Sequence, residues 1–300
     1  MRRRLLALSF ALTAALPSTA HATYSIIATD PESGRVGAAG ASCVPYEVIQ
    51  IYGDVPGRGA FVAQANFDDA AFDEALFLLQ DGQTADTILA SVTDTRAFPQ
   101  APKMQYGIVD SLGGSASSTG PEALDVAVDR RGELGSMRYA ALGNILTSEL
   151  VVDQASKAFE ADACDLAARL VQALEAAGDG GEGDSRCTPD GVPAKSAFVE
   201  VSDASGVLLR ISVPDVSPAD PIVELRGRFD AWRAEHPCPT IEEGGGGAGG
   251  GASDGEEPPP AIADDDCAAS PASGSHAPAG WSIVLTAVAA LRLSTRRARA

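Results

Sequence analysis

The chain has 300 residues, of which 45% are hydrophobic, and its formal net charge at pH 7 is -19. This length and hydrophobic content suffice for one sizeable core or two small ones. The excess of acidic residues excludes a general nucleic-acid-binding protein, because such a protein needs a basic face to neutralise phosphates.

Histidine is scarce in this sequence. The chain has three, His21, His236 and His276, and we expect two of them to lie outside the folded domain. The remaining one leaves little room for a zinc site or for the usual base beside a serine or cysteine nucleophile. Any catalysis therefore needs another base, and the sequence predicts neither a metal site nor an organic cofactor.

Residues 1–22 have the pattern of a secretory signal peptide. Three arginines at positions 2–4 precede an apolar stretch over residues 5–16, and Ala20-His21-Ala22 has the small-x-small form of a cleavage site. The alternative is a short buried helix. Cleavage after Ala22 makes Thr23 the first residue of the mature chain.

Hairpins and pairs of helices follow one another over residues 23–241. Strands are predicted at residues 24–29, 36–44, 59–65, 105–110, 115–119, 139–146, 197–202 and 207–213. Helices are predicted at residues 69–80, 85–92 with Thr84 as the cap, 148–159, 164–176 and 220–235. The Gly/Ala-rich second strand allows another layer to approach closely. We expect the last helix to bury Ile222, Val223, Leu225, Phe229 and Trp232. This order favours an α+β fold of antiparallel sheets covered by helices.

The C-terminal part of the chain is not typical of a folded domain. Residues 242–280 are rich in Gly, Pro, Ser and Asp, which predicts a flexible stalk. Cys267 lies in this stalk, and the last segment, residues 281–300, joins an apolar stretch to four arginines. The order of these features resembles the sorting tails of myxobacterial surface proteins (the MYXO-CTERM type), in which the cysteine marks the processing site. The alternative is a disordered acidic tail with a hydrophobic end.

Export makes the cysteines candidates for disulfide bonds. Apart from Cys267, the chain has Cys43, Cys164, Cys187 and Cys238, which allow three connectivities. We favour Cys164–Cys187, because it ties a helix to the Gly-rich loop that follows, and this leaves Cys43 with Cys238. The alternative is that some are buried free thiols.

Thr23 supplies a nucleophile and a base together once it is the first residue. Its hydroxyl and its free α-amine belong to one residue, and an α-amine with an ordinary pKa near 8 is partly neutral at mild pH. The neutral amine accepts the hydroxyl proton directly or through one water. The α-amine thus provides a base for catalysis in a domain where histidine is scarce.

Several short motifs follow Thr23 in a specific order. They include Thr23-Tyr24-Ser25-Ile26-Ile27-Ala28-x-Asp30-Pro31, Ala63-Gln64-Ala65-Asn66, Gln105-Tyr106-Gly107-Ile108-Val109-Asp110, Thr119-Gly120, Gly143-Asn144-x-Leu146, Gly183-Asp184-x-Arg186 and Ser196-Ala197. In this order they resemble the bacterial family called domain of unknown function 1028, which is assigned to the Ntn (N-terminal nucleophile) hydrolase superfamily. The resemblance implies a four-layer αββα sandwich with the nucleophile at the head of a strand. Residues 121–137 depart from the family's pattern, as does the region from Cys187 to Ser196.

The same motifs contain further candidate site residues. We expect Asp184 to orient the terminal amine and Arg186 to hold an anionic substrate group, with a local salt bridge as the alternative. Asn66 and Asn144 are candidate donors to an oxyanion, although an asparagine after glycine is as often a turn residue. Ser25 is the fallback nucleophile. His236 is expected to be a helix-end residue only.

These observations predict an exported N-terminal-nucleophile hydrolase, secreted or anchored at the cell surface. Its substrate is a small-molecule or peptide-like amide, and its other partners are signal peptidase and a C-terminal sorting machinery. The alternative is a non-catalytic surface-displayed binding module on the same fold. The sequence leaves open whether the chain forms a homo-oligomer.

Overall fold

The computed structural model describes residues 23–238. The predictions for the signal peptide, the stalk, Cys267, His21, His276 and the C-terminal tail lie outside these residues. Within them, ten strands form two antiparallel sheets. The strands are β1 Thr23–Asp30, β2 Arg35–Ser42, β3 Tyr52–Val55, β4 Gly59–Gln64, β5 Gln105–Asp110, β6 Ser115–Thr119, β7 Val128–Leu134, β8 Met137–Asn144, β9 Ser196–Asp203 and β10 Gly206–Val213.

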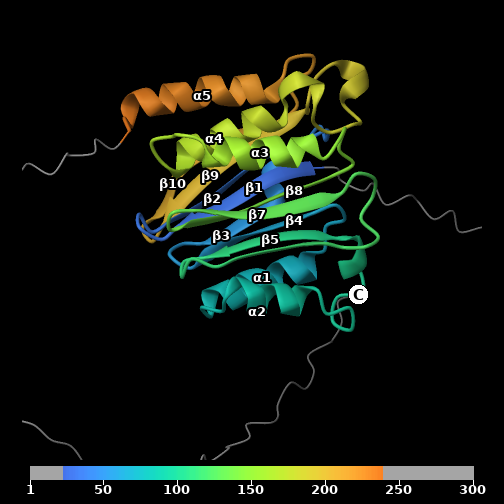
Figure 1. Ribbon diagram of the computed structural model, residues 1–300, viewed down its shortest axis with the longest axis vertical. Coiled ribbons are helices and arrows are strands. Elements are labelled where there is room, and N and C mark those ends of the chain that lie inside the picture. The colour runs from blue at the N-terminus through green and yellow to red at the C-terminus, as the bar shows by residue number, and fades with distance from the viewer. Residues whose placement is uncertain (1–22, 239–300) are drawn as a thin grey trace, which may run out of the picture. The chain divides into compact units, whose positions relative to one another are not determined.

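The two sheets face each other and helices cover their outer faces (Figure 1). One sheet has the order β10-β9-β2-β1-β8-β7 and the other has the order β3-β4-β5-β6. The helices are α1 Asp69–Gln80, α2 Ala85–Val92, α3 Leu150–Glu160, α4 Leu166–Ala177 and α5 Pro221–Glu235. α1 and α2 pack on the four-stranded sheet, and α3, α4 and α5 pack on the six-stranded sheet. The predicted α+β class with antiparallel sheets is confirmed.

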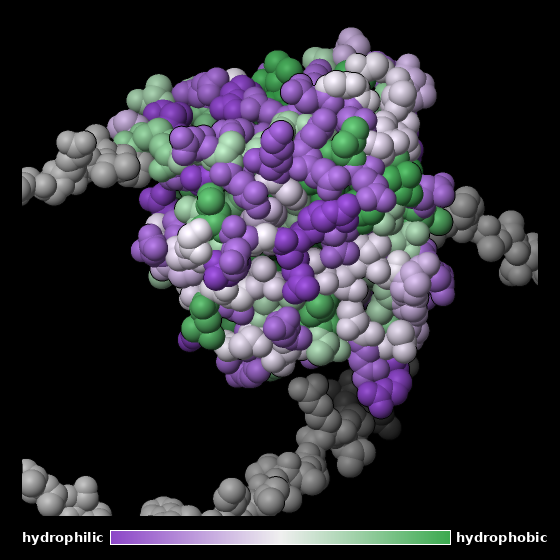
Figure 2. Space-filling model, viewed as in Figure 1, coloured by the Kyte–Doolittle hydropathy of each residue, from purple (hydrophilic) through white to green (hydrophobic). Residues whose placement is uncertain are grey.

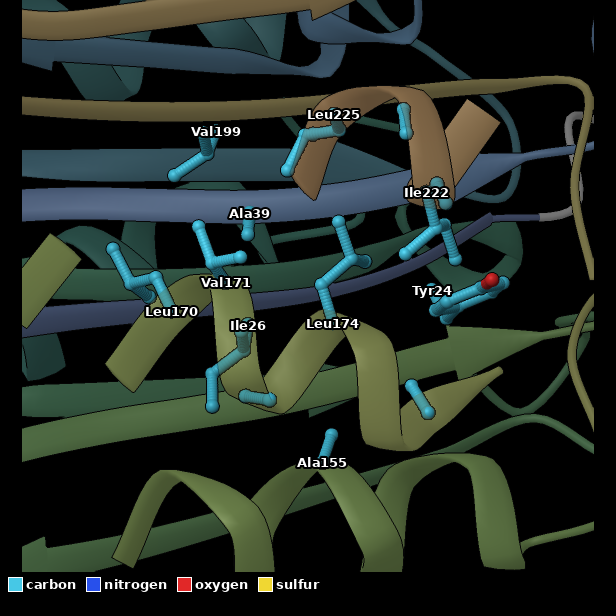
Figure 3. Close-up of a cluster of buried hydrophobic side chains, with 14 of the residues drawn as sticks. Tyr24, Ile26, Ala39, Ala155, Leu170, Val171, Leu174, Val199, Ile222 and Leu225 are labelled. Carbon is cyan, nitrogen blue, oxygen red and sulfur yellow. The ribbon is translucent and has the colours of Figure 1, made fainter. Parts of the chain in front are cut away.

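The hydrophobic core under α3, α4 and α5 is the largest cluster among the described residues. Figure 3 shows Ile26 of β1 near Leu170 and Leu174 of α4, and Tyr24 of β1 near Ile222 of α5. The Gly/Ala-rich β2 lies directly under α4. A Cβ on Gly37 would lie 3.0 Å from Leu170 Cδ1 and 2.5 Å from the Glu200 carbonyl oxygen. The expected close approach of a second layer to this strand is therefore confirmed.

Three sequence expectations about these elements need correction. Residues 121–137 are not merely an insertion, because they include β7, an edge strand in which four of the seven residues are charged. The prediction also missed β3, a short edge strand that contains Gly53. Val223 does not belong to the buried face of α5 and is 69% exposed, because one residue along a helix turns the side chain by about 100°.

The outer surface is polar, as the charge of the chain requires. On the face seen in Figure 2, hydrophilic residues predominate and hydrophobic residues are scattered among them. Single exposed apolar side chains are normal on such a surface.

Asp110 joins the end of β5 to the start of α2, and we expect its loss to destabilise the fold strongly. Its buried carboxylate accepts N–H groups of Ala85 at 2.8 Å, Leu112 at 2.9 Å and Gly114 at 2.8 Å. Asp110→Ala leaves these donors unsatisfied. The free energy of unfolding, measured by urea denaturation, should fall by about 3 kcal/mol.

Two variants control this prediction. Asp110→Asn keeps one acceptor oxygen and should lose less stability. Asp162 is exposed, so Asp162→Ala should change the free energy of unfolding by less than about 0.5 kcal/mol. Equal stability of the three variants would show that the Asp110 contacts do not hold the turn.

Candidate functional site

Thr23 lies at an edge of the six-stranded sheet where three strands end. β1 begins at Thr23, β2 ends at Ser42 and β8 ends at Asn144. The strand register pairs Thr23 with Asn144, and the Thr23 hydroxyl donates to the Ser42 hydroxyl at 3.3 Å. Because side chains alternate along a strand, Thr23 and Ser25 face the second sheet while Tyr24 faces the helices. Thr23 is buried in the 300-residue chain, in which its nitrogen is an amide bonded to Ala22.

Two buried glutamines of the facing sheet hold the Thr23 segment. Gln64, the last residue of β4, donates to the Thr23 carbonyl at 3.0 Å and to Gln105 Oε1 at 3.1 Å. Gln64 also accepts the Ser25 hydroxyl at 2.7 Å. Gln105, the first residue of β5, donates to the Gly143 carbonyl at 2.8 Å. The network therefore bridges both sheets and fixes the backbone of residue 23 in place.

Asn144 completes this network and has one unused acceptor. Its amide nitrogen donates to Gln105 Oε1 at 3.0 Å and to the Thr23 carbonyl at 3.5 Å. Its Oδ1 atom is buried without a hydrogen-bond partner among the described residues. An unsatisfied buried acceptor costs about 1–3 kcal/mol, so this oxygen is available to a donor group that arrives next to residue 23.

The loop over residues 183–187 closes behind this edge of the sheet. Asp184 is 1% exposed, and its carboxylate accepts the Cys43 N–H at 2.7 Å and the Arg186 guanidinium at 2.8 Å. Ser185 donates its N–H to the Ile145 carbonyl at 3.0 Å. The local salt bridge, one of the two readings of the Asp184 and Arg186 pair, is present. Their assignment to the amine and to an anionic substrate group stays a prediction.

The cysteines form two disulfides, and the favoured pairing is wrong. Cys43 is bonded to Cys187, and Cys164 is bonded to Cys238. The chain that follows α4 does not stay beside this helix but crosses to the end of β2, where Asp184 accepts the Cys43 N–H. This brings Cys187 next to Cys43. Cys164 precedes α4, and Cys238 follows α5, which packs against α4.

Thr23 lines a cavity of about 170 Å³ between the two sheets and the segment after β2. Most of its wall is apolar, and Thr23, Ser42 and Gln64 supply buried polar groups. Tyr46 and Phe67 stand at the wall and are partly exposed. Burial raises the pKa of the Tyr46 phenol, and the charge of the Arg186 guanidinium opposes this rise.

A second cavity of about 350 Å³ adjoins the first and has a different chemistry. It is lined by Asn66, Gln100, Lys103, Glu122, Leu124, Asn144 and Ala65, and Ala65 also lines the first cavity. The two asparagines singled out from the sequence thus share one cavity. Its wall contains both charges and amides, which suits a polar group.

Two of the residues with a strained backbone lie at or next to these cavities, Ala65 in the wall of both and Ile145 directly after Asn144. Among the described residues, positive φ angles at residues other than glycine occur at Ala65 (76°), Asp125 (20°), Val126 (39°) and Ile145 (52°). Ile145 follows Asn144 directly, and its N–H donates to the Asp125 carbonyl at 2.7 Å. A β-branched residue in this region is strained by about 1–3 kcal/mol, and such strain clusters at functional sites.

The remaining sequence candidates are also placed by the structure. Ser25 is 5% exposed and lies two residues inside β1, bound to Gln64. His236 follows the last residue of α5 and stacks on Trp232, so its predicted position at a helix end is confirmed. Sequence reasoning missed the roles of Ser42, Gln64 and Gln105. Gln64 and Gln105 belong to the motifs quoted above. The one feature of the sequence that could have indicated their role is a polar amide at the end of an otherwise apolar strand.

Fold and site together define an α+β protein of two facing antiparallel sheets, with a strand-terminal threonine in a buried polar network. Residues 23–225 match the family described as "Family of unknown function (DUF1028)", and the chain belongs to this family. The crystal structure of protein SPO2555 from Silicibacter pomeroyi, described as DUF1028, is similar with a TM-score of 0.57 and 25% sequence identity. This similarity covers 71% of the present chain and 86% of that chain. No match was found among curated proteins.

Two observations bear on the compartment of the protein. Its two disulfides are compatible with an exported protein, because disulfides persist in oxidising environments. In the part of the chain that the structure describes, no helix has the length and apolar character needed to cross a membrane.

Proposed function

We propose that this protein is an exported amidohydrolase of the N-terminal-nucleophile type, with Thr23 as its nucleophile. The observation that carries the proposal is the position of Thr23. It begins a central strand, lines a cavity, and is the residue at which both the family match and the predicted mature chain begin. The paired sheets between helical layers agree with the four-layer αββα sandwich of the Ntn-hydrolase type.

The mechanism begins with the removal of residues 1–22, which turns the amide nitrogen of Thr23 into an amine. The neutral amine takes the proton from Thr23 Oγ1, and the oxygen attacks the carbonyl carbon of a substrate amide. The C–N bond breaks, the amine passes the proton to the leaving nitrogen, and an ester on Thr23 remains. Water then hydrolyses this ester and restores the hydroxyl.

The surrounding residues hold Thr23 in position and do not act as acid or base. Gln64 and Asn144 hold the Thr23 carbonyl, and Ser42 orients its hydroxyl. The unused Asn144 Oδ1 is an acceptor for the new amine, which would end its unsatisfied state. Asn66 is the candidate donor to the oxyanion, since it lines the adjacent cavity.

The proposal is tested on protein purified after export from a host with signal peptidase. We expect intact mass and N-terminal sequencing to give a chain that starts at Thr23. We also expect an activated p-nitrophenyl ester to acylate Thr23 and leave Ser25 free, as peptide mapping would show. A mature chain that starts before Thr23, or at Ser25 or later, would favour the non-catalytic binding module instead.

A further inference from the structure

The two adjoining cavities differ in chemistry, and this difference bears on the substrate. The cavity of Thr23 has a mostly apolar wall, formed by Val44, Val48, Ile51 and Ala63 and by the rings of Tyr46 and Phe67, and the exposed Glu47 and Gln50 also line it. The cavity of Asn144 contains Lys103 and Glu122 beside amide groups. Thr23 and Asn144 are cross-strand partners, and Ala65 lines both cavities. A molecule bound across this junction therefore has one apolar and one polar half.

The chemistry of acyl transfer decides which half enters which cavity. After the C–N bond breaks, the acyl group stays attached to Thr23 Oγ1, so it needs the cavity that Thr23 itself lines. The amine half leaves, and the second cavity is twice as large, at about 350 Å³ against about 170 Å³. The apolar half is therefore the acyl group and the polar half is the leaving amine.

Lys103 indicates that the leaving half of the substrate carries a negative charge. Its side chain is exposed at the second cavity and forms no ion pair with a described residue. An ammonium group in such surroundings attracts a carboxylate. Glu122 and the amides on the same wall suit the polar remainder of an amino acid.

We infer that the substrate is an N-acyl amino acid, with a short apolar acyl chain in the Thr23 cavity and its carboxylate at Lys103. This places the anionic group at Lys103 and not at Arg186, whose guanidinium is bound by Asp184. This inference rests on the proposed function. The products are a carboxylic acid and a free amino acid, and water is the co-reactant. Each further methylene buried in the apolar cavity should raise kcat/KM about fourfold until the cavity is full, as follows from about 0.8 kcal/mol per methylene.

The experiment compares three substrates of the mature protein: N-hexanoylglycine, N-acetylglycine and N-hexanoylglycinamide. Release of the free amine is measured. We expect kcat/KM for N-hexanoylglycine to exceed that for N-acetylglycine by at least about tenfold. We also expect it to exceed that for the uncharged glycinamide by about tenfold, because the amide lacks the carboxylate.

Two lysine variants separate binding from general charge effects. Lys103→Met should abolish the preference for the carboxylate and keep the preference for the hexanoyl group. Lys157→Met removes an exposed lysine on α3 and should change neither preference.

Val48→Phe fills the Thr23 cavity and should reduce the preference for hexanoyl over acetyl, with folding checked by thermal melting.

The outcomes distinguish this inference from the proposed function. If Thr23 is acylated by the activated ester but no N-acylglycine is hydrolysed, or the two acyl groups react equally, the inference is overturned while Thr23 remains the nucleophile. Retention of the carboxylate preference in Lys103→Met also overturns it. If Thr23 is never acylated and no amide is cleaved, both proposals fail.

Discussion

Replacing Thr23 by alanine should lower the turnover of an amide substrate by at least about 10³-fold, because the variant keeps the α-amine but lacks the attacking oxygen. Thr23→Ser keeps both groups and should retain activity. Adding one alanine before Thr23 keeps the hydroxyl but converts the amine into an amide, and turnover should fall as far as in Thr23→Ala. Purified mature protein and steady-state kinetics provide the measurement.

The pH dependence of the same reaction identifies the base. Only the neutral amine accepts a proton, so kcat should rise with pH through the pKa of the α-amine, which is near 8 when unperturbed. Thermal melting of each variant controls for folding, since Thr23 is buried. Equal turnover of the wild type, Thr23→Ala and the extended chain would remove the proposed mechanism.

Removing the Cys43–Cys187 disulfide should cause the largest loss of stability and also lower activity. The bond closes a loop with a sequence separation of 144 residues, and the loop-entropy estimate for such a bond is about 3–5 kcal/mol. It also holds the loop of Asp184 against Cys43, the neighbour of Ser42. We expect Cys43→Ala/Cys187→Ala to unfold at lower urea concentration and to show reduced kcat/KM.

The second disulfide is the matched control. Cys164 and Cys238 connect the regions around α4 and α5, with a sequence separation of 74 residues, away from the Thr23 cavity. Cys164→Ala/Cys238→Ala should lose stability and keep the kcat/KM of its folded form. The same loss of kcat/KM in both double variants would contradict a positioning role for the Cys43–Cys187 bond.

Local patterns in the sequence predicted most elements well. The helix at Asp69–Gln80 and the strands at Gln105–Asp110 and Ser115–Thr119 were predicted with the bounds that the structure has. Thr84 was identified as an N-cap, and its hydroxyl accepts the Thr87 N–H at 3.3 Å. The helix buries one face, so its hydrophobic period is visible in the sequence. The first of the two strands is buried at every position, and the turn residues that follow it mark the hairpin.

The strands that the prediction missed have no such period. β7 (Val128–Leu134) carries Asp, Arg and Glu and lies at a sheet edge, where few of its side chains are buried. β3 (Tyr52–Val55) is four residues long and also an edge strand. Their pairing with the neighbouring strand, not their own composition, makes them strands.

The candidate site was partly predictable for the same reason. Thr23 was found because a cleavage pattern and a strand pattern meet at one residue. Gln64 and Gln105 were quoted for their motifs but given no role, since an amide in an apolar strand does not reveal which residue it contacts. Gln64 contacts Thr23 across 41 positions of sequence.

The amino-acid sequence by itself determined the helices, the hairpins β1–β2, β5–β6 and β9–β10, the family and the position of Thr23 in the sequence, because these depend on neighbouring residues and on short motifs. Only the tertiary structure decided the cysteine partners, the glutamine network and the two cavities. Those depend on the strand order β10-β9-β2-β1-β8-β7, which places the ends of β1, β2 and β8 at one edge. Contacts between segments so distant in sequence arise from packing the layers together, and no local propensity encodes them.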